Sequence, residues 1–153
     1  MSDVNKIDMF KNDVRYRDNI AHVETIPAKE ASFKKVENLN EKIVRYLDSK
    51  GVSLYKHQAE TYEAIKDGEN VIITTSTASG KTLAFNLPIM DTMMEDGDAT
   101  ALYIYPAKAL SNDQLHVLEN LERELDVNIR PRTYDGDTPR ENKREIRERK
   151  SVV

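Results

Sequence analysis

Apolar residues recur three or four positions apart in three stretches of the chain, and this spacing predicts three helices. The first is predicted near residues 39–50 and the second between Tyr55 and Ile65, each followed by a glycine as a stop signal. The third follows the GKT triplet, with apolar positions at Leu83, Leu87, Met90 and Met94. Pro88 lies inside this third helix, so we expect a bend or one lost backbone hydrogen bond there.

Short runs rich in β-branched and aromatic residues alternate with these helices. NVIITT (70–75) and TALYIYP (100–106) are typical of buried strands. NIRPRTY (128–134) is a weaker strand candidate, because Pro131 cannot donate a hydrogen bond to a sheet. The final residues, 151–153, resemble the opening of a fourth strand.

Two further helices complete the alternation. Ser111, with Gln114 three residues later, suggests a capping box for a helix running to Leu125, and Thr138 followed by Pro139 suggests another helix start. Strands that alternate with helices predict an α/β fold, a parallel sheet with helices on both faces. Because such a domain should not finish three residues into a strand, we expect a truncated domain from a longer protein.

The first 38 residues differ from the rest of the chain. They are polar, mixed in charge and poor in periodic apolar positions, although residues 8–19 are compatible with a short helix. We therefore divide the chain into an N-terminal extension, residues 1–38, and a partial α/β domain, residues 39–153, whose C-terminal part is missing.

The stretch TTSTASGKT (74–82) joins the first strand to the third helix. A tight loop in this position directs backbone N–H groups and the positive end of the helix dipole at one point, which suits polyphosphate. Gly80 would let the backbone pass close to the phosphate, Lys81 would supply a positive charge, and Thr82 would offer a hydroxyl to Mg²⁺. The stretch predicts an ATP·Mg²⁺ site, with Lys81 and Thr82 as its chemically active residues.

The loop departs from the strict phosphate-loop pattern at one position, where Thr75 replaces glycine. Ala78 must also take up the loop geometry without the freedom of glycine. The alternative is a strand-to-helix turn that binds no ligand. The residues expected to surround the phosphates are Thr77, Ala78, Ser79, Gly80, Lys81 and Thr82.

Composition narrows the class of protein. The chain has 153 residues, a formal net charge of −4 and no cysteine, which excludes disulfides and thiolate metal sites. It contains no apolar run near the roughly 20 residues that span a bilayer, and no signal-peptide core. We expect a cytoplasmic protein without a membrane partner.

Four segments carry a resemblance to a known family: LYKHQAE (54–60), TSTASGKTLAFNLPIM (75–90), YIYPAKALSNDQ (103–114) and YDGDTPR (134–140). In order and spacing they resemble the first motor domain of superfamily 2 helicases of the DEAD/DEAH-box type, closest to the MrfA (YprA)/Hrq-type DNA-repair branch. The resemblance implies a RecA-like (P-loop NTPase) fold and a parent enzyme that couples ATP hydrolysis to 3′-to-5′ movement along single-stranded DNA, with RNA as an alternative partner.

The resemblance also implies roles for individual residues. Gln58 matches the glutamine that recognises adenine, and Tyr55 would stack near the base; the alternative for Gln58 is an ordinary surface glutamine. An amide suits adenine, because it presents a donor and an acceptor together.

Residues in two other segments match strand-contacting motifs. Pro106 and Lys108 belong to one, and Gly136 and Thr138 to the next. Helix capping in the first segment and an ordinary Asp-Gly turn in the second are the alternatives.

The helicase reaction also needs an acidic pair that holds Mg²⁺ and positions water. Asp91, Asp96 and Asp98 lie on or just past a helix, so none is assigned this role. We expect the acidic motif and the second motor domain in the remainder of the helicase chain, and an isolated fragment that hydrolyses ATP poorly. A small-molecule kinase and a stand-alone nucleotide-binding module remain as alternatives.

Overall fold

The computed structural model describes residues 3–24, 27 and 30–148, which form two compact units. The first unit, up to Ala31, contains α1 (Asp3–Asn12) and a short 3-10 helix, η1 (Arg17–Asn19). The helical turns therefore begin earlier than the predicted residues 8–19 and are interrupted before η1. The second unit begins at Ser32, and the predicted boundary at residue 38 stays a prediction.

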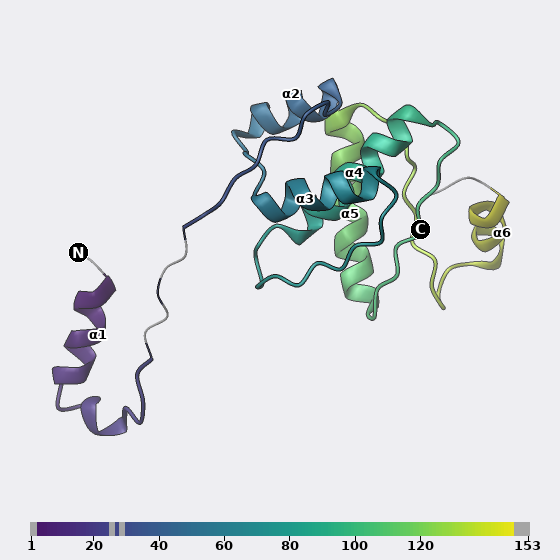
Figure 1. Ribbon diagram of the computed structural model, residues 1–153. Coiled ribbons are helices and arrows are strands. Elements are labelled where there is room, and N and C mark those ends of the chain that lie inside the picture. The colour runs from purple at the N-terminus through teal and green to yellow at the C-terminus, as the bar shows by residue number, and fades with distance from the viewer. Residues whose placement is uncertain (1–2, 25–26, 28–29, 149–153) are drawn as a thin grey trace. The chain divides into compact units, whose positions relative to one another are not determined.

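The second unit is helical in its regular structure, as Figure 1 shows. Its helices are α2 (Glu41–Lys50), α3 (Lys56–Lys66), α4 (Lys81–Glu95), α5 (Lys108–Leu125) and α6 (Arg140–Glu148). Local signals explain the ends of α2: the Asn40 side chain accepts the N–H of Lys42 at 2.9 Å, and Gly51 ends the helix with φ +61°. The first three predicted helices are thus confirmed. No helix in the described part of the chain is both long and apolar enough to cross a membrane.

The predicted start of α5 is wrong. The helix begins at Lys108 after the N-cap residue Ala107, and Ser111 lies inside it, donating its N–H to the Ala107 carbonyl at 3.1 Å. Lys, Ala and Leu are good helix formers, so the helix continues N-terminally until it reaches Pro106. Ser111 and Gln114 therefore do not form the capping box.

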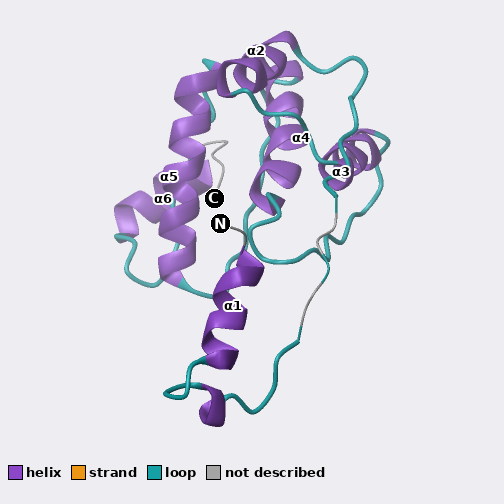
Figure 2. Ribbon diagram, turned by 90° about the vertical axis from the view of Figure 1, so that its left-hand side faces the viewer, coloured by secondary structure: helices purple, strands orange, loops and turns teal. Residues whose placement is uncertain are grey.

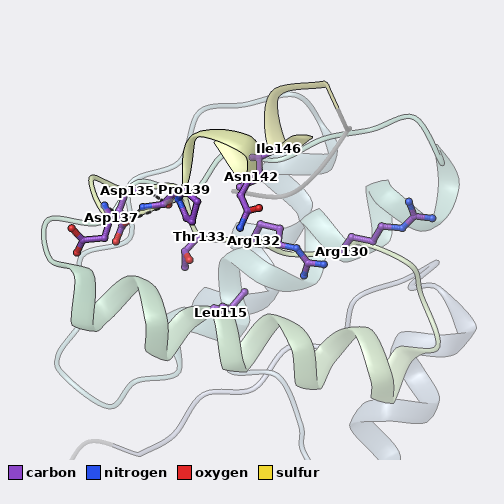
Figure 3. Close-up of a pocket in the computed structure, with 10 residues that line it drawn as sticks. Leu115, Arg130, Arg132, Thr133, Asp135, Asp137, Pro139, Asn142 and Ile146 are labelled. Atoms are coloured by element: carbon purple, nitrogen blue, oxygen red, sulfur yellow. Dashed lines mark hydrogen bonds between the residues drawn. The ribbon is translucent and has the colours of Figure 1, made fainter. Parts of the chain in front are cut away.

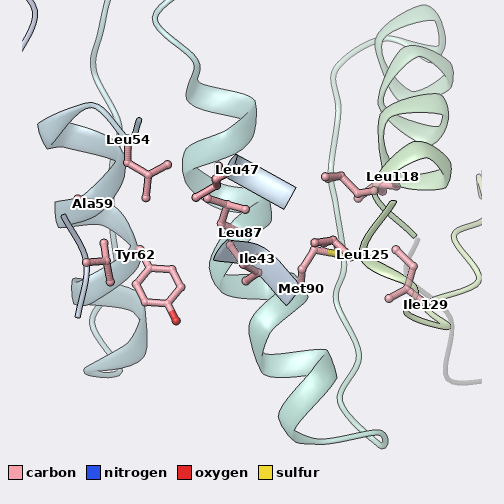
Figure 4. Packing of buried hydrophobic residues seen from close by; sticks show 12 residues of the cluster. Ile43, Leu47, Leu54, Ala59, Tyr62, Leu87, Met90, Leu118, Leu125 and Ile129 are labelled. Atoms are coloured by element: carbon pink, nitrogen blue, oxygen red, sulfur yellow. The ribbon is translucent and has the colours of Figure 1, made fainter. Parts of the chain in front are cut away.

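The hydrophobic core lies between the helices of the second unit and is shown in Figure 4. Helix α3 packs against α4, and α2 packs against α5. The buried core residues are Val36, Ile43, Leu47, Leu54, Ala59, Tyr62, Leu87, Met90, Leu118, Leu121, Leu125 and Ile129. The periodic apolar positions of the sequence thus provide the packing that holds α3 and α4, the two helices that carry the predicted nucleotide-binding residues.

The predicted parallel sheet is not confirmed. Among residues 3–24, 27 and 30–148 the only pairing is one isolated antiparallel bridge between Phe33 and Tyr55, and Figure 2 draws the predicted strand segments as loop. Ile72 is 89% exposed and Ile104 83%, so these segments lack neighbours that would cover their side chains and pair with their backbone. In the third segment Arg130 has φ +49°, which interrupts an extended conformation. Residues 151–153, the proposed fourth strand, lie outside the described residues.

Candidate functional site

The phosphate loop has the backbone that its sequence suggested. Ala78 adopts φ +61° and Gly80 φ +78°, both in the left-handed region that non-glycine residues seldom occupy. A Cβ atom on Gly80 would lie 2.4 Å from Nε2 of Gln58, well inside van der Waals contact. Gly80 is therefore required both for its backbone angle and for the close approach of α3.

Thr75, the departure from the strict pattern, closes the loop on itself. Its Oγ1 lies 2.6 Å from Oγ of Ser79, at hydrogen-bond distance. The ammonium group of Lys81 lies across the loop and donates to the carbonyls of Thr75 at 2.7 Å and Ser76 at 2.5 Å. Thr75 thus supports the loop with side-chain and backbone oxygens, a role that the motif comparison did not assign to it.

Thr82 lies in the first turn of α4, where it lines a cavity of about 460 Å³ together with Gly80 and Asn86. Asn86 is 1% exposed, its Oδ1 accepts from the Tyr103 hydroxyl at 2.8 Å, and its Nδ2 has no hydrogen-bond partner within the described residues. Burial raises the pKa of the Tyr103 hydroxyl, and the nearby Tyr105 raises it further to a smaller extent. The cavity therefore lies against the first turns of α4, with the Thr82 and Asn86 side chains in its lining.

The N-terminal turn of α3 contacts the phosphate loop directly. Nε2 of His57 lies 3.0 Å from the Ser79 carbonyl, and Nε2 of Gln58 donates to the Gly80 carbonyl at 3.0 Å. Oε1 of Gln58 also accepts the N–H of Tyr55 at 2.9 Å. Gln58 is only 3% exposed, so the alternative of a surface glutamine is wrong. Its role toward adenine stays a prediction.

Three aromatic rings stack beside this contact. Phe33 stacks on Tyr55 with centroids 5.1 Å apart, and Tyr55 stacks on His57 at 5.8 Å. Phe33 and Tyr55 are 56% and 38% exposed, so the outer end of this aromatic column faces solvent. Sequence reasoning identified Tyr55 but missed Phe33 and His57. Phe33 reaches Tyr55 from a separate segment, and the partner of His57, Ser79, lies 22 residues further along the chain.

A buried polar cluster joins α3 to α4. The Tyr62 hydroxyl donates to Asp91 at 2.5 Å, and the Lys66 ammonium lies 2.9 Å from the same carboxylate and 2.5 Å from Glu95. Asp91 is 2% exposed. The pKa of the Tyr62 hydroxyl is raised mainly by burial and also by its hydrogen bond to Asp91. Asp91 therefore links the two helices through Tyr62 and Lys66. Within the described residues no group of three or more His, Cys, Asp or Glu side chains could hold a metal ion.

Two segments predicted to contact nucleic acid lie side by side. Lys108, two residues after Pro106, forms an ion pair with Asp137 and lies 3.8 Å from Asp135. The hydrogen bond to Asp137 raises the pKa of Lys108. The start of α5 and the turn at residues 135–138 therefore form one surface, which the sequence alone could not establish.

The turn at residues 135–138 is stabilised by its own side chains. Thr138 Oγ1 accepts the N–H of Asp135 at 2.9 Å and lies 3.0 Å from Oδ1 of Asp135, to which it donates. The side-chain hydrogen bond from Thr138 lowers the pKa of Asp135. The carbonyl of Gly136 accepts a hydrogen bond from the Lys143 ammonium group, 3.3 Å away. Thr138 therefore stabilises the turn, and its contact with nucleic acid stays a prediction.

A cavity of about 530 Å³ adjoins this turn. Figure 3 shows Asp135 and Asp137 toward one end of it and Arg132 and Arg130 toward the other. Sequence reasoning missed both arginines, although they flank Pro131 in a segment expected to be a strand. Both arginines line the cavity together with Asn142 and add positive charge to its lining.

The loop that joins an extended segment to the glycine, lysine and threonine at the start of α4 places this chain in the phosphate-loop class of domains. Residues 55–153 match the DEAD/DEAH box helicase family. The chain belongs to this family, and its solved relatives give it a RecA-like helicase fold.

Named relatives support the same assignment. The chain is 33% identical to the ATP-dependent helicase YprA of Bacillus subtilis, covering 93% of this chain and 19% of the relative. It is 35% identical to the ATP-dependent helicase HRQ1 of Saccharomyces cerevisiae, covering 96% of this chain and 14% of the relative. The chain thus spans less than a fifth of the length of these two relatives.

Solved structures of the helicase MrfA are similar in fold. One, described as bound to DNA, matches with a TM-score of 0.87 and 32% identity over 100% of this chain and 22% of that chain. Another, described as bound to DNA and AMPPNP, matches with a TM-score of 0.78 and 35% identity over 84% of this chain and 18% of that chain. These similarities place the chain in the MrfA/Hrq-type branch of superfamily 2 helicases.

Proposed function

We propose that this chain is the N-terminal ATP-binding part of a superfamily 2 DNA helicase that acts in DNA repair. The observation that carries the proposal is the loop before α4, in which Lys81 lies across a backbone turned by positive φ angles at Ala78 and Gly80. Such a loop offers backbone N–H groups and a lysine to a polyphosphate. On binding, the phosphates of ATP would replace the loop carbonyls as partners of Lys81, and the Thr82 hydroxyl would contact Mg²⁺.

The adenine base would lie beside the N-terminal turn of α3. Gln58 uses one amide N–H and one lone pair of its oxygen within the protein, so a second N–H and a second lone pair remain for the base. Phe33 and His57 stack on the Tyr55 ring, so Tyr55 would lie near the base with the exposed part of its side chain. The contact from Gln58 to Gly80 would then link the base to the phosphate loop.

Single-stranded nucleic acid would contact the surface formed by the start of α5 and the turn at residues 135–138. Lys108 would bind a backbone phosphate, with Pro106, Gly136 and Thr138 at the same surface. DNA is the favoured partner and RNA the alternative. Asp137 now neutralises Lys108, so a phosphate would have to displace this ion pair.

The exposed apolar side chains of residues 70–75 and 100–106 support a role for both segments as strands of a parallel sheet, completed by the remainder of the helicase chain. Ile72, Leu102 and Ile104 would be buried when further strands lie beside them. The remainder would also supply the acidic pair and the second motor domain needed for hydrolysis. We therefore expect this chain alone to bind ATP·Mg²⁺ weakly and not to hydrolyse it efficiently.

Calorimetric titration with ATP·Mg²⁺ tests the proposal. Lys81→Ala should abolish binding, because it removes the positive charge nearest to the phosphates. Lys56→Ala is the matched control: this lysine lies on α3 and forms an exposed ion pair with Glu60 at 3.7 Å, so binding should stay unchanged. Equal affinity of Lys81→Ala and the unmodified chain would refute the assignment. A longer chain with both motor domains should show ATPase activity that rises with single-stranded DNA.

A further inference from the structure

Two consecutive residues of α3 hold two consecutive carbonyls of the phosphate loop. His57 contacts the carbonyl of Ser79 and Gln58 that of Gly80, each at 3.0 Å. Because a carbonyl oxygen only accepts hydrogen bonds, the His57 ring must carry a proton on Nε2 and donate it. His57 has no function in the proposed contacts with ATP, so this contact needs an explanation of its own.

Holding a carbonyl also orients the N–H group of the same peptide unit. The described chain contains no cis peptide bond, and in a trans peptide the C=O and N–H groups point in opposite directions. A contact that draws the Ser79 carbonyl toward α3 therefore turns the N–H of Gly80 away from α3. The Gly80 carbonyl, which Gln58 contacts, also accepts the N–H groups of Leu83 and Ala84, so α4 itself orients the N–H of Lys81. These N–H groups lie at the start of α4, where no intrahelical acceptor is available to them.

The imidazole ring is itself held in place. It stacks on Tyr55 with an angle of 11° between the ring planes, and Tyr55 stacks on Phe33 at 18°. His57 is therefore held by the aromatic column on one side and by the loop on the other. This arrangement resists rotation of the ring, which would break the contact with Ser79.

We infer that His57 is a positioning residue: it presets the peptide between Ser79 and Gly80 so that the Gly80 N–H faces the bound phosphate. The inference rests on the proposed nucleotide site. Its effect is on the phosphate-binding backbone and not on the base, and this distinction makes it testable.

Substitutions of His57 separate the hydrogen bond from the ring stack. His57→Phe keeps a ring that can stack on Tyr55 but removes the donor, and should weaken ATP·Mg²⁺ binding about five- to tenfold, the effect of one hydrogen bond. His57→Gln places an amide nitrogen near the position of Nε2 and should restore most of this affinity. If His57→Phe does not fold, as judged by circular dichroism, His57→Leu is less bulky and carries the same expectation.

The probe that decides the question is magnesium tripolyphosphate, which has no base. We would measure its displacement of a fluorescent ATP analogue from the whole chain. The same loss for tripolyphosphate and ATP supports the inference. A loss confined to ATP would assign His57 to the base, and unchanged affinity in a folded variant would leave it without a role in binding; either result overturns the inference. If Lys81→Ala also leaves binding unchanged, the proposed function fails; if Lys81→Ala abolishes it, only the inference about His57 fails.

Discussion

Replacing Gly80 by alanine perturbs the centre of the site in two ways. The residue has φ +78°, and its new Cβ atom would lie 2.4 Å from Nε2 of Gln58. Gly68 offers a matched control, because it has φ +81° and no atom within 4 Å of the same position. Gly68→Ala therefore carries the backbone strain alone, whereas Gly80→Ala carries the strain and the displacement of the Gln58 amide.

The contacts of Gln58 set how much more Gly80→Ala should destabilise the chain than Gly68→Ala. A left-handed alanine costs roughly 1–2 kcal/mol, partly offset by the lower entropy of the unfolded chain, and this applies to both variants. Displacing Gln58 also breaks its hydrogen bonds to Gly80 and Tyr55 in a buried place, at roughly 1 kcal/mol each. We expect Gly80→Ala to lower the free energy of unfolding by about 2 kcal/mol more than Gly68→Ala.

Urea denaturation followed by circular dichroism at 222 nm measures both free energies of unfolding. Calorimetric titration with ATP·Mg²⁺ should show that Gly80→Ala loses binding while Gly68→Ala keeps it. Equal destabilisation of the two variants would refute the reasoning, since it would mean that the Gln58 amide moves aside without cost.

The other predictions concern the cluster between α3 and α4 and the surface at Lys108. Tyr62→Phe removes a buried hydrogen bond to the charged Asp91 and should lower the free energy of unfolding by about 2 kcal/mol, measured with urea. Glu63→Gln, which breaks an exposed ion pair on the same helix, should change it by less than about 0.5 kcal/mol; equal effects would contradict the role of burial. Asp137→Asn removes the nearer of the two carboxylates beside Lys108 and leaves Asp135 at 3.8 Å; it should raise the affinity for a fluorescent single-stranded oligonucleotide several-fold at low salt, measured by anisotropy. Unchanged affinity would argue against a contact between Lys108 and a backbone phosphate.

The helices could be predicted from the sequence because their signals are local. Asn40 and Gly51 mark the ends of α2, and apolar residues at helical spacing mark the buried face of α3 and α4. The start of α5 was misplaced because Ser111 fits a capping pattern equally well inside a helix. Local signals thus predict that a helix exists better than they predict where it begins.

The parallel sheet, unlike the helices, could not be predicted from local signals alone. Residues 70–75 and 100–106 have the composition of strands, but a strand also needs a partner for its backbone, and that partner comes from elsewhere in the chain. The side chains of Ile72 and Ile104 remain exposed here, so composition alone does not produce pairing. The sheet therefore stays a proposal, although the similarity to the MrfA structures supports the RecA-like helicase fold.

The phosphate loop, its position before α4 and the resemblance to DEAD/DEAH box helicases could all be recognised from the order of the amino acids alone. This was possible because these features depend on neighbouring residues and on their order. The contacts of His57 and Gln58 with the loop carbonyls, and the ion pair between Lys108 and Asp137, depend instead on how the chain packs. These contacts join segments that are distant in the chain, and packing between the elements that carry them decides which side chains meet.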